Sequence, residues 1–282
     1  IFSQIYPRNW IHFYKTIRNT ILSSYNKPIN ELVTPVLQLS AVEINNVKLF
    51  AKKNNLEKFK NVVLFECNPG SGQSKVNLEF ATEISRKVIE INNEVCFILT
   101  SHGKLNFKNP QIIDASELTF RENAELTKYC TLLIGCSSGI TWLSTSDWAK
   151  KLPMVQLLDS QSFFFAGVHY DFELNKLDNS RVIEIIKFDF NKICKCIQSL
   201  FSDDFSEVKN SYHQEYKPNS ENLYRFTKDL INRNFNLFRI IGYSLNYIAY
   251  NYRNNNKIKI NYLDYIKKLS KLYFKKLQSS HL

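Results

Sequence analysis

The sequence lacks the patterns that mark disulfide-bonded and zinc-binding proteins. Its six cysteines include no CxxC pair, and the spacing of Cys194 and Cys196 does not suit a zinc knuckle. We therefore expect no metal site. The other four cysteines lie in or beside apolar runs: Cys67, Cys96, Cys130 and Cys136. There we expect reduced, buried thiols, as in a cytoplasmic protein.

The sequence also lacks long apolar runs. No stretch reaches about 18 consecutive apolar residues, the minimum for a membrane-spanning helix. The first residues do not show the basic-then-apolar order of a secretion signal, so we expect neither a spanning segment nor export. The chain starts at Ile1 and Met154 is its only methionine, which leads us to expect the C-terminal part of a longer protein.

Short apolar runs alternate with amphipathic stretches through the middle of the chain. At 44% hydrophobic residues, the chain can bury a sizeable core. Strands are predicted at 61–66, 94–100, 111–114, 131–136, 153–158 and 182–188. Helices are predicted at 42–56, 80–91, 121–129 and 140–149. In the second helix, Phe80, Ala81, Ile84, Val88 and Ile91 recur at steps of three and four residues. This alternation favours an α/β fold with a Rossmann-like, doubly wound parallel sheet.

The first predicted strand is followed by a loop that suits a phosphate. The segment 66–76 reads ECNPGSGQSKV, and its candidate binding residues are Pro69, Gly70, Ser71, Gly72, Ser74 and Lys75. Loops at the carboxyl ends of parallel strands lead into helix N-termini, where free N–H groups and the helix dipole attract anions. The spacing fits neither GxxxxGK[ST] nor GxGxxG, which excludes a nucleotide-hydrolase loop. An ordinary glycine and serine turn is the alternative.

A second small-residue loop follows the fourth predicted strand. The segment 134–144 reads IGCSSGITWLS. Ser137 or Ser138 is expected to cap the following helix, while the amides of Ser138, Gly139 and Ile140 face a diphosphate. A plain capped turn between strand and helix is the alternative. The two loops together are more informative than either alone.

Residues 66–158 resemble the C-terminal, donor-binding half of GT-B glycosyltransferases, and in particular the heptosyltransferase-like branch, glycosyltransferase family 9. Pro69, Gly70 and Ser71 match the family's PG(S/A) loop. Ser138 and Gly139 match the Ser-Gly pair of the segment that closes the donor site. The chain departs from the family by having a serine at 137 instead of aspartate and a tryptophan at 142 instead of histidine.

The resemblance implies a sugar transfer from a nucleotide-diphosphate donor, which is a substrate and not a cofactor. The acceptor would be a surface glycan, such as lipopolysaccharide, or a lipid-linked molecule. In inverting enzymes of this type the base usually comes from the N-terminal half, so the catalytic residue is unknown here. Lys75 and the amides at 138–140 would offset the charge on the leaving diphosphate. A non-catalytic GT-B-like binding module and a sugar-nucleotide epimerase are the alternatives.

Other polar residues are weaker candidates. Ser101 ends the second strand, and Glu122 lies where the family contacts the base or ribose. Arg121 could pair with a phosphate, although an exposed helix start is the simpler interpretation. His102 is expected to be merely exposed, and His169 is close enough in sequence to Asp171 for a local hydrogen bond.

The resemblance divides the chain into three predicted parts. Residues 1–58 would be a connector and the remnant of the acceptor domain, 59–188 the donor-binding domain, and 189–282 a helical, basic extension. The extension carries much of the net charge of +11, since residues 253–282 contain many lysines and one acid. The basic residues of this segment are Arg253, Lys257, Lys259, Lys267, Lys268, Lys271, Lys275 and Lys276, and its acid is Asp264.

The last helix of the extension has an apolar face and a basic face. The apolar face is predicted to hold Tyr262, Ile266, Leu269, Tyr273 and Leu277. Such a helix suits an anionic membrane surface, at about 1 kcal/mol per lysine. The alternative is a terminal helix that packs its apolar stripe on the protein. We expect a cytoplasmic protein, with peripheral contact to the inner membrane face if the first interpretation holds. No nucleic-acid-binding motif accompanies the charge, so nucleic acid is not expected as a partner.

Overall fold

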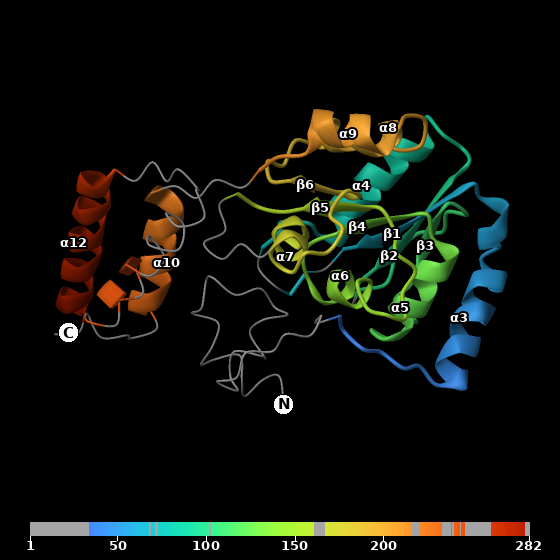
Figure 1. Cartoon of the computed structure of the whole chain (residues 1–282), viewed down its shortest axis with the longest axis horizontal. Helices are drawn as coiled ribbons and strands as arrows, with labels where there is room; N and C mark the ends of the chain where they lie inside the picture. The colour runs from blue at the N-terminus through green and yellow to red at the C-terminus, as the bar shows by residue number, and fades with distance from the viewer. Residues whose placement is uncertain are drawn as a thin grey trace. The chain divides into compact units, whose positions relative to one another are not determined.

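The computed structural model describes residues 34–67, 69–70, 73–101, 103–160, 167–215, 220–232, 238, 240–242, 244–245 and 261–279. The helices and strands form two compact units, one built around a sheet and one of helices. Each unit is described by itself below, and Figure 1 labels the elements.

A six-stranded parallel sheet forms the centre of the larger unit. Its strands are β1 (Asn61–Glu66), β2 (Val95–Thr100), β3 (Ile112–Asp114), β4 (Leu132–Gly135), β5 (Met154–Leu157) and β6 (Val182–Ile185). They lie in the order β3-β2-β1-β4-β5-β6, and every pairing is parallel. All six predicted strands and the Rossmann-like α/β fold are confirmed. The strand order reverses direction between β1 and β4. From β1 the chain continues to β2 and β3 on one side, and from β4 it continues to β5 and β6 on the other.

Helices cover both faces of the sheet (Figure 1). One face is covered by α4 (Leu78–Ile89), α8 (Phe190–Ser199) and α9 (Phe205–Tyr212), and the other by α3 (Ala41–Lys53), α5 (Glu122–Leu126) and α6 (Gly139–Leu143). The remaining elements of this unit are α7 (Val168–Leu174) and two short 3-10 helices, Leu56–Lys58 and Thr127–Tyr129. Because both faces are covered, the strands are mostly apolar on both sides instead of alternating.

The packing of α4 shows how the sequence pattern becomes a core. Asn77 caps the helix, its side chain accepting a hydrogen bond from the N–H of Phe80 at 2.8 Å. Ala81, Ile84 and Val88 are 0% exposed and pack in the main apolar cluster. Burial of a side chain the size of isoleucine or valine contributes about 1.5–3 kcal/mol. The predicted stripe is therefore confirmed at these three positions.

The helix predicted at 140–149 ends early, at Leu143. Ser144, Thr145 and Ser146 follow it, and the Thr145 hydroxyl donates to the Trp142 carbonyl at 2.8 Å. The main-chain N–H of Thr145 also bonds the carbonyl of Trp142, three residues back instead of four. Hydroxyl side chains that bond nearby carbonyls weaken a helix, so a serine and threonine run terminates this one.

The sheet unit extends beyond the predicted donor domain of 59–188. Its described residues run from 34 to 159 and from 167 to 215, so α3, α8 and α9 belong to it. In the main apolar cluster, α8 contributes Ile193, Cys194, Cys196 and Ile197, and α9 contributes Val208. The apolar faces of α8 and α9 thus complete the core on one side of the sheet.

The smaller unit contains α10 (Ser220–Asn232) and α12 (Tyr262–Ser279). Leu223 and Leu230 of α10 pack with Tyr265 of α12, whose hydroxyl lies 2.7 Å from that of Thr227. Leu269 and Leu272 pack against the same cluster. The predicted stripe on α12 is thus correct at Leu269 and wrong at Ile266, which is 57% exposed. The side chains of Tyr262, Tyr273 and Leu277 lie outside the described residues. In the described part of the chain, no helix has the length and apolarity to span a bilayer.

Candidate ligand site at the switch point of the sheet

The two predicted loops meet at the carboxyl edge of the sheet. β1 and β4 are neighbours, with Phe65 opposite Ile134, so the segments that follow them start side by side. We call these the β1–α4 loop (67–77) and the β4–α6 loop (136–138). The hydroxyl of Ser74 hydrogen-bonds the thiol of Cys136, which joins one loop to the other. Open parallel sheets bind their ligands at this kind of position, where the strand order reverses.

Glu66 places a buried carboxylate under the β4–α6 loop. This side chain is 2% exposed and ends β1. It accepts hydrogen bonds from the N–H of Cys136 at 3.0 Å, the N–H of Ile140 at 3.3 Å and the hydroxyl of Thr141 at 2.7 Å. The Ser138 hydroxyl donates to it as well. Burial raises the pKa of this carboxyl, and the four donors oppose that rise.

The β4–α6 loop has a strained conformation. Ser137 has a φ of 50°, in the left-handed region that side chains other than glycine and asparagine seldom occupy, and it is 0% exposed. Its N–H donates to Oε1 of Gln156 on β5 at 2.9 Å. Just before the loop, a Cβ on Gly135 would lie 2.3 Å from the Thr141 hydroxyl oxygen and 2.4 Å from Nε2 of Gln156. Only glycine fits there.

Lys75 belongs to the β1–α4 loop, and its side chain is 62% exposed. Its Nζ is 3.1 Å from Oδ2 of Asp159, which follows β5. The N–H of Asp159 donates to the carbonyl of Gln73 at 2.7 Å. These contacts attach the end of the β1–α4 loop to the segment after β5. An exposed ion pair of this kind contributes little stability, at most about 1 kcal/mol, so a ligand anion can compete for the lysine.

The structure corrects the predicted helix cap. Neither Ser137 nor Ser138 caps α6 with its side chain, because Ser137 is buried and the Ser138 hydroxyl bonds Glu66. Glu66 takes that role from the neighbouring strand. The Ile140 amide, which was expected to face a diphosphate, donates to Glu66 instead.

The remaining residues of the first predicted loop are only partly described. Pro69 is half-buried, and Gly70 is exposed with open space where a Cβ would be. Ser71, Gly72 and the histidine at 102 lie outside the described residues. Of the described loop residues, Ser74 contacts the β4–α6 loop by a hydrogen bond to Cys136, while Lys75 pairs with Asp159 after β5.

Phe120 approaches the start of α6 from the segment after β3. A Cβ on Gly139 would lie 2.6 Å from its ring, so the ring rests on that glycine. Phe120 is 54% exposed, so it has room to move. Sequence reasoning missed Phe120, Glu66 and Gln156. A polar residue inside an otherwise apolar parallel strand, as at 66 and 156, is the signal that could have identified the last two.

Ser101, Arg121 and Glu122 all have protein partners. The Ser101 hydroxyl accepts from the N–H of Gly103 at 3.0 Å. Glu122 is 2% exposed and accepts from Asn46 Nδ2 at 2.9 Å and the N–H of Thr119 at 2.6 Å. These bonds account for the burial of Glu122 without a ligand.

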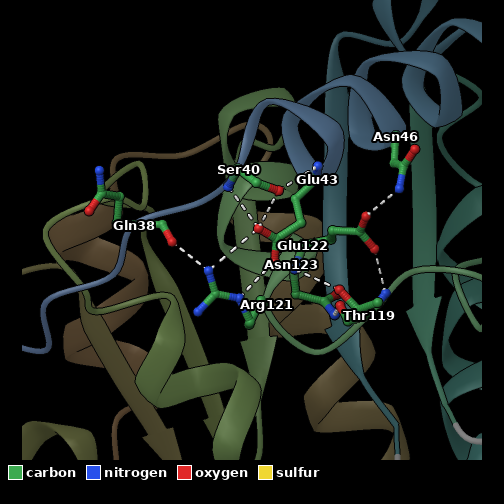
Figure 2. Close-up of polar contacts among 8 residues, drawn as sticks. All are labelled: Gln38, Ser40, Glu43, Asn46, Thr119, Arg121, Glu122 and Asn123. Atoms are coloured by element: carbon green, nitrogen blue, oxygen red, sulfur yellow. Dashed lines mark hydrogen bonds and ion pairs between the residues drawn. The ribbon is translucent and has the colours of Figure 1, made fainter.

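Arg121 and Glu122 instead fasten α3 to α5, as Figure 2 shows. Nε of Arg121 donates to Oε1 of Glu43 at 2.7 Å, and its guanidinium also bonds the carbonyl of Gln38. Glu43 in turn forms a capping box with Ser40 at the start of α3. The hydrogen bond from Arg121, with those from Ser40, lowers the pKa of Glu43 to about 2. We call these contacts the α3 clamp.

A second buried carboxylate, Glu184 on β6, caps α7 in the same way. It accepts from the N–H of His169 at 2.9 Å, and burial raises its pKa to about 7. Its own N–H donates to Nδ1 of His213 at 3.0 Å, and the two imidazole rings lie 4.6 Å apart. His169 therefore bonds β6 through its main chain and stacks on His213. Asp171 is buried and accepts from Asn175 at 3.3 Å.

The cysteines and acids form no metal centre in the described part of the chain. No group of three or more His, Cys, Asp or Glu there is placed to hold a metal ion. All six cysteines are free and buried; burial had been predicted for Cys67, Cys96, Cys130 and Cys136. Burial raises the pKa of each of the six thiols, so none has the thiolate character of a nucleophile.

Comparisons with known proteins add little. No protein-family model matches the chain, and no curated protein does. Among solved structures, it is similar to the crystal structure of the glycosyl transferase family 9 from Veillonella parvula DSM 2008. The identity is 14%, the TM-score is 0.45, and the match covers 69% of this chain and 57% of the other. The chain thus spans less than two thirds of that protein, and the function proposed below does not depend on this likeness.

Proposed function

We propose that this chain is the donor-binding part of a glycosyltransferase, which moves a sugar from a nucleotide-diphosphate donor to a glycan or lipid-linked acceptor. The observation that supports this most is the meeting of the β1–α4 and β4–α6 loops, through Ser74 and Cys136, where the strand order reverses. The motifs shared with the GT-B family lie in these same two loops. Lys75 supplies the positive charge that a diphosphate needs.

The donor would lie across the carboxyl ends of β1 and β4. Lys75 would leave Asp159 to bind a phosphate oxygen, while Ser138 and Gly139, which are partly exposed, would contact the donor from the other loop. As the bond to the sugar breaks, negative charge develops on the diphosphate, and a positioned lysine stabilises it. The base that activates the acceptor is not assigned to this chain.

Isothermal titration against UDP-, GDP- and ADP-sugars tests this proposal. We expect binding of at least one donor, and a loss of about tenfold for Lys75→Ala, the size expected for a charge-assisted hydrogen bond. Gly139→Val should abolish binding because its side chain would displace Phe120 into the site.

Lys87→Ala is the matched control for the lysine variant. Lys87 also pairs with a carboxylate at 3.1 Å and is 52% exposed, but it lies in the last turn of α4, away from the two loops. The Lys87→Ala variant should bind the donor with the same affinity as the wild type. Binding that is unchanged in both Lys75→Ala and Gly139→Val, or absent from the wild type, would contradict the proposal.

We also propose that the helical unit binds the anionic inner face of the cell membrane, which would bring the chain to a lipid-linked acceptor. Leu263 and Ile266 of α12 are 73% and 57% exposed, and the exposed Lys267 and Lys271 lie on the same helix. Apolar side chains flanked by lysines suit a negatively charged bilayer. Co-sedimentation should be stronger with phosphatidylglycerol vesicles than with phosphatidylcholine vesicles, and Ile266→Asp should weaken it. Equal binding to the two kinds of vesicle would contradict this proposal and favour the interpretation that the lysines are only exposed to solvent.

A non-catalytic binding module is the second candidate, and Glu66 favours it. This carboxylate already occupies the N–H groups of Cys136 and Ile140, which a donor diphosphate would otherwise use. No affinity of the chain for ADP, GDP or UDP would support the module over the transferase.

A further inference from the structure

The β4–α6 loop holds a conformation that its own sequence does not favour. Ser137 has a positive φ, and such strain persists only where the surroundings over-determine the backbone. Gln156 holds one end of the loop through the N–H of Ser137. The absence of a side chain at Gly135 leaves room for Thr141 and Gln156 to approach. These contacts fix the start of the loop and not the part that faces outward.

Glu66 fixes the remaining part. Its carboxylate accepts hydrogen bonds from the N–H of Cys136 and the hydroxyl of Ser138 in the loop, and from the N–H of Ile140 and the hydroxyl of Thr141 in the first turn of α6. Within the described residues, no other side chain contacts as many groups of this loop. Because Glu66 is anchored in β1, it also sets the distance between the two loops.

The outer side of the loop remains available to a ligand. Ser138, Gly139 and Ile140 are half-buried, so one side of each meets solvent while the other meets Glu66 or Phe120. A separate observation points to a missing acceptor. Nε2 of Gln156, a residue that is 0% exposed, has no hydrogen-bond partner among the described residues. Buried donors are nearly always satisfied, so a water or ligand oxygen is expected beside it.

We propose that Glu66 is the positioning residue of the donor site: it holds the β4–α6 loop so that Ser138 and Gly139 face the donor. This inference depends on the proposed function, because it names what prepares that site for its substrate. The Glu66 carboxylate neutralises the positive end of α6, so the diphosphate relies on Lys75 for its countercharge.

Glu66→Gln tests the proposal, with Glu184→Gln as its matched control. Both residues are buried carboxylates at strand positions that cap a short helix, so both variants should destabilise the fold similarly. The probes are ADP, GDP and UDP, titrated calorimetrically into the whole chain. We expect Glu66→Gln to weaken binding of the nucleotide that the wild type prefers by about tenfold. Glu184→Gln should bind within about twofold of the wild type.

Thr141→Val provides a second test if Glu66→Gln does not fold. It removes one of the four donors to Glu66 with little change in volume, and we expect a weakening of about threefold. The proposal is overturned if the nucleotide binds the Glu66 and Thr141 variants as it binds the wild type. It is equally overturned if Glu184→Gln weakens binding as much as Glu66→Gln. A wild type that binds none of the three nucleotides refutes the proposed function itself, and this inference with it.

Discussion

At the scale of single residues, polar side chains inside apolar strands give this protein its distinctive features. Glu66 on β1 and Glu184 on β6 are buried, yet each accepts hydrogen bonds from the start of a helix. Gln156 on β5 holds the N–H of Ser137. An isolated buried charge is strongly unfavourable, and these bonds offset that penalty. The residues thus connect the sheet to the loops at its edge.

Ser137 should respond to substitution in the reverse of the usual order. At an ordinary position, alanine is more stable than glycine. Here the left-handed backbone penalises a Cβ by roughly 1–2 kcal/mol, so Ser137→Gly should be more stable than Ser137→Ala by about 1 kcal/mol. Both variants lack the hydroxyl, which cancels its contribution. Urea unfolding measures the difference, and a more stable alanine variant would contradict a left-handed Ser137.

His213 should make stability depend on pH. Burial, His169 and Lys209 lower its pKa from 6.5 to about 4. A depressed pKa gives stability that is complete above pH 6.5 and is lost as the pH falls through about 4, because the unfolded chain takes up the proton first. His213→Asn keeps an acceptor for the Glu184 N–H but does not titrate.

The stability of the variant relative to the wild type should therefore increase as the pH falls from 6.5 to 4, by about 1–2 kcal/mol, because solvent screens a half-buried imidazole. Urea unfolding at pH 8, 6 and 4.5 measures this. Glu184, whose pKa is raised to about 7, loses its stabilising effect as the pH rises towards 7, but it is present in both proteins and cancels. Parallel stability profiles for the two proteins would rule out a lowered pKa for His213 in the folded protein.

At the scale of elements, the strands could be predicted and the contacts between distant segments could not. Parallel strands buried on both faces leave continuous apolar runs, as in residues 61–66 and 94–100, and all six were found this way. Their order also placed the two loops together. Local spacing carries no information about Glu66 and Cys136, which lie 70 residues apart, or about Glu43 and Arg121, which lie 78 apart. The sequence therefore could not predict that the Ile140 amide at the start of α6 donates to Glu66.

The α3 clamp gives a prediction at this scale. Glu122→Ala should destabilise the protein by about 1–3 kcal/mol, because it removes a buried side chain together with its hydrogen bonds from Asn46 and from the N–H of Thr119. Arg121→Ala should have a smaller effect, since that side chain is 47% exposed and its ion pair is screened by solvent. Chemical unfolding of the two variants ranks them. A larger loss for Arg121→Ala would refute this account of how α3 is held.

At the scale of the whole molecule, the sheet unit and the helical unit have separate cores. The apolar cluster of the helical unit, with Leu223, Leu230 and Tyr265, contains no residue of the sheet. The sequence suggested a boundary between the two units at residue 189. It could not show that α8 and α9 belong to the sheet unit, because they have the same amphipathic pattern as the helices beyond them. Only their contacts with the sheet core assign them to it.

Leu223→Ala should therefore affect one unit alone. Leu223 is 0% exposed, and its truncation should lower the stability of the helical unit by about 2–5 kcal/mol. Hydrogen exchange should accelerate at the amides of α10 and α12 while those of β1, β2 and β4 keep their protection. Accelerated exchange in the sheet would show that the two units unfold together.

The central claim is that a nucleotide-diphosphate sugar binds where the β1–α4 and β4–α6 loops meet. The most direct measurement is the amide spectrum of the whole chain by NMR, recorded during titration with ADP, GDP and UDP. The account predicts shifts for at least one nucleotide, concentrated at residues 73–76 and 136–141 and absent from α10 and α12. Shifts confined to other elements, or none with any of the three, would contradict it.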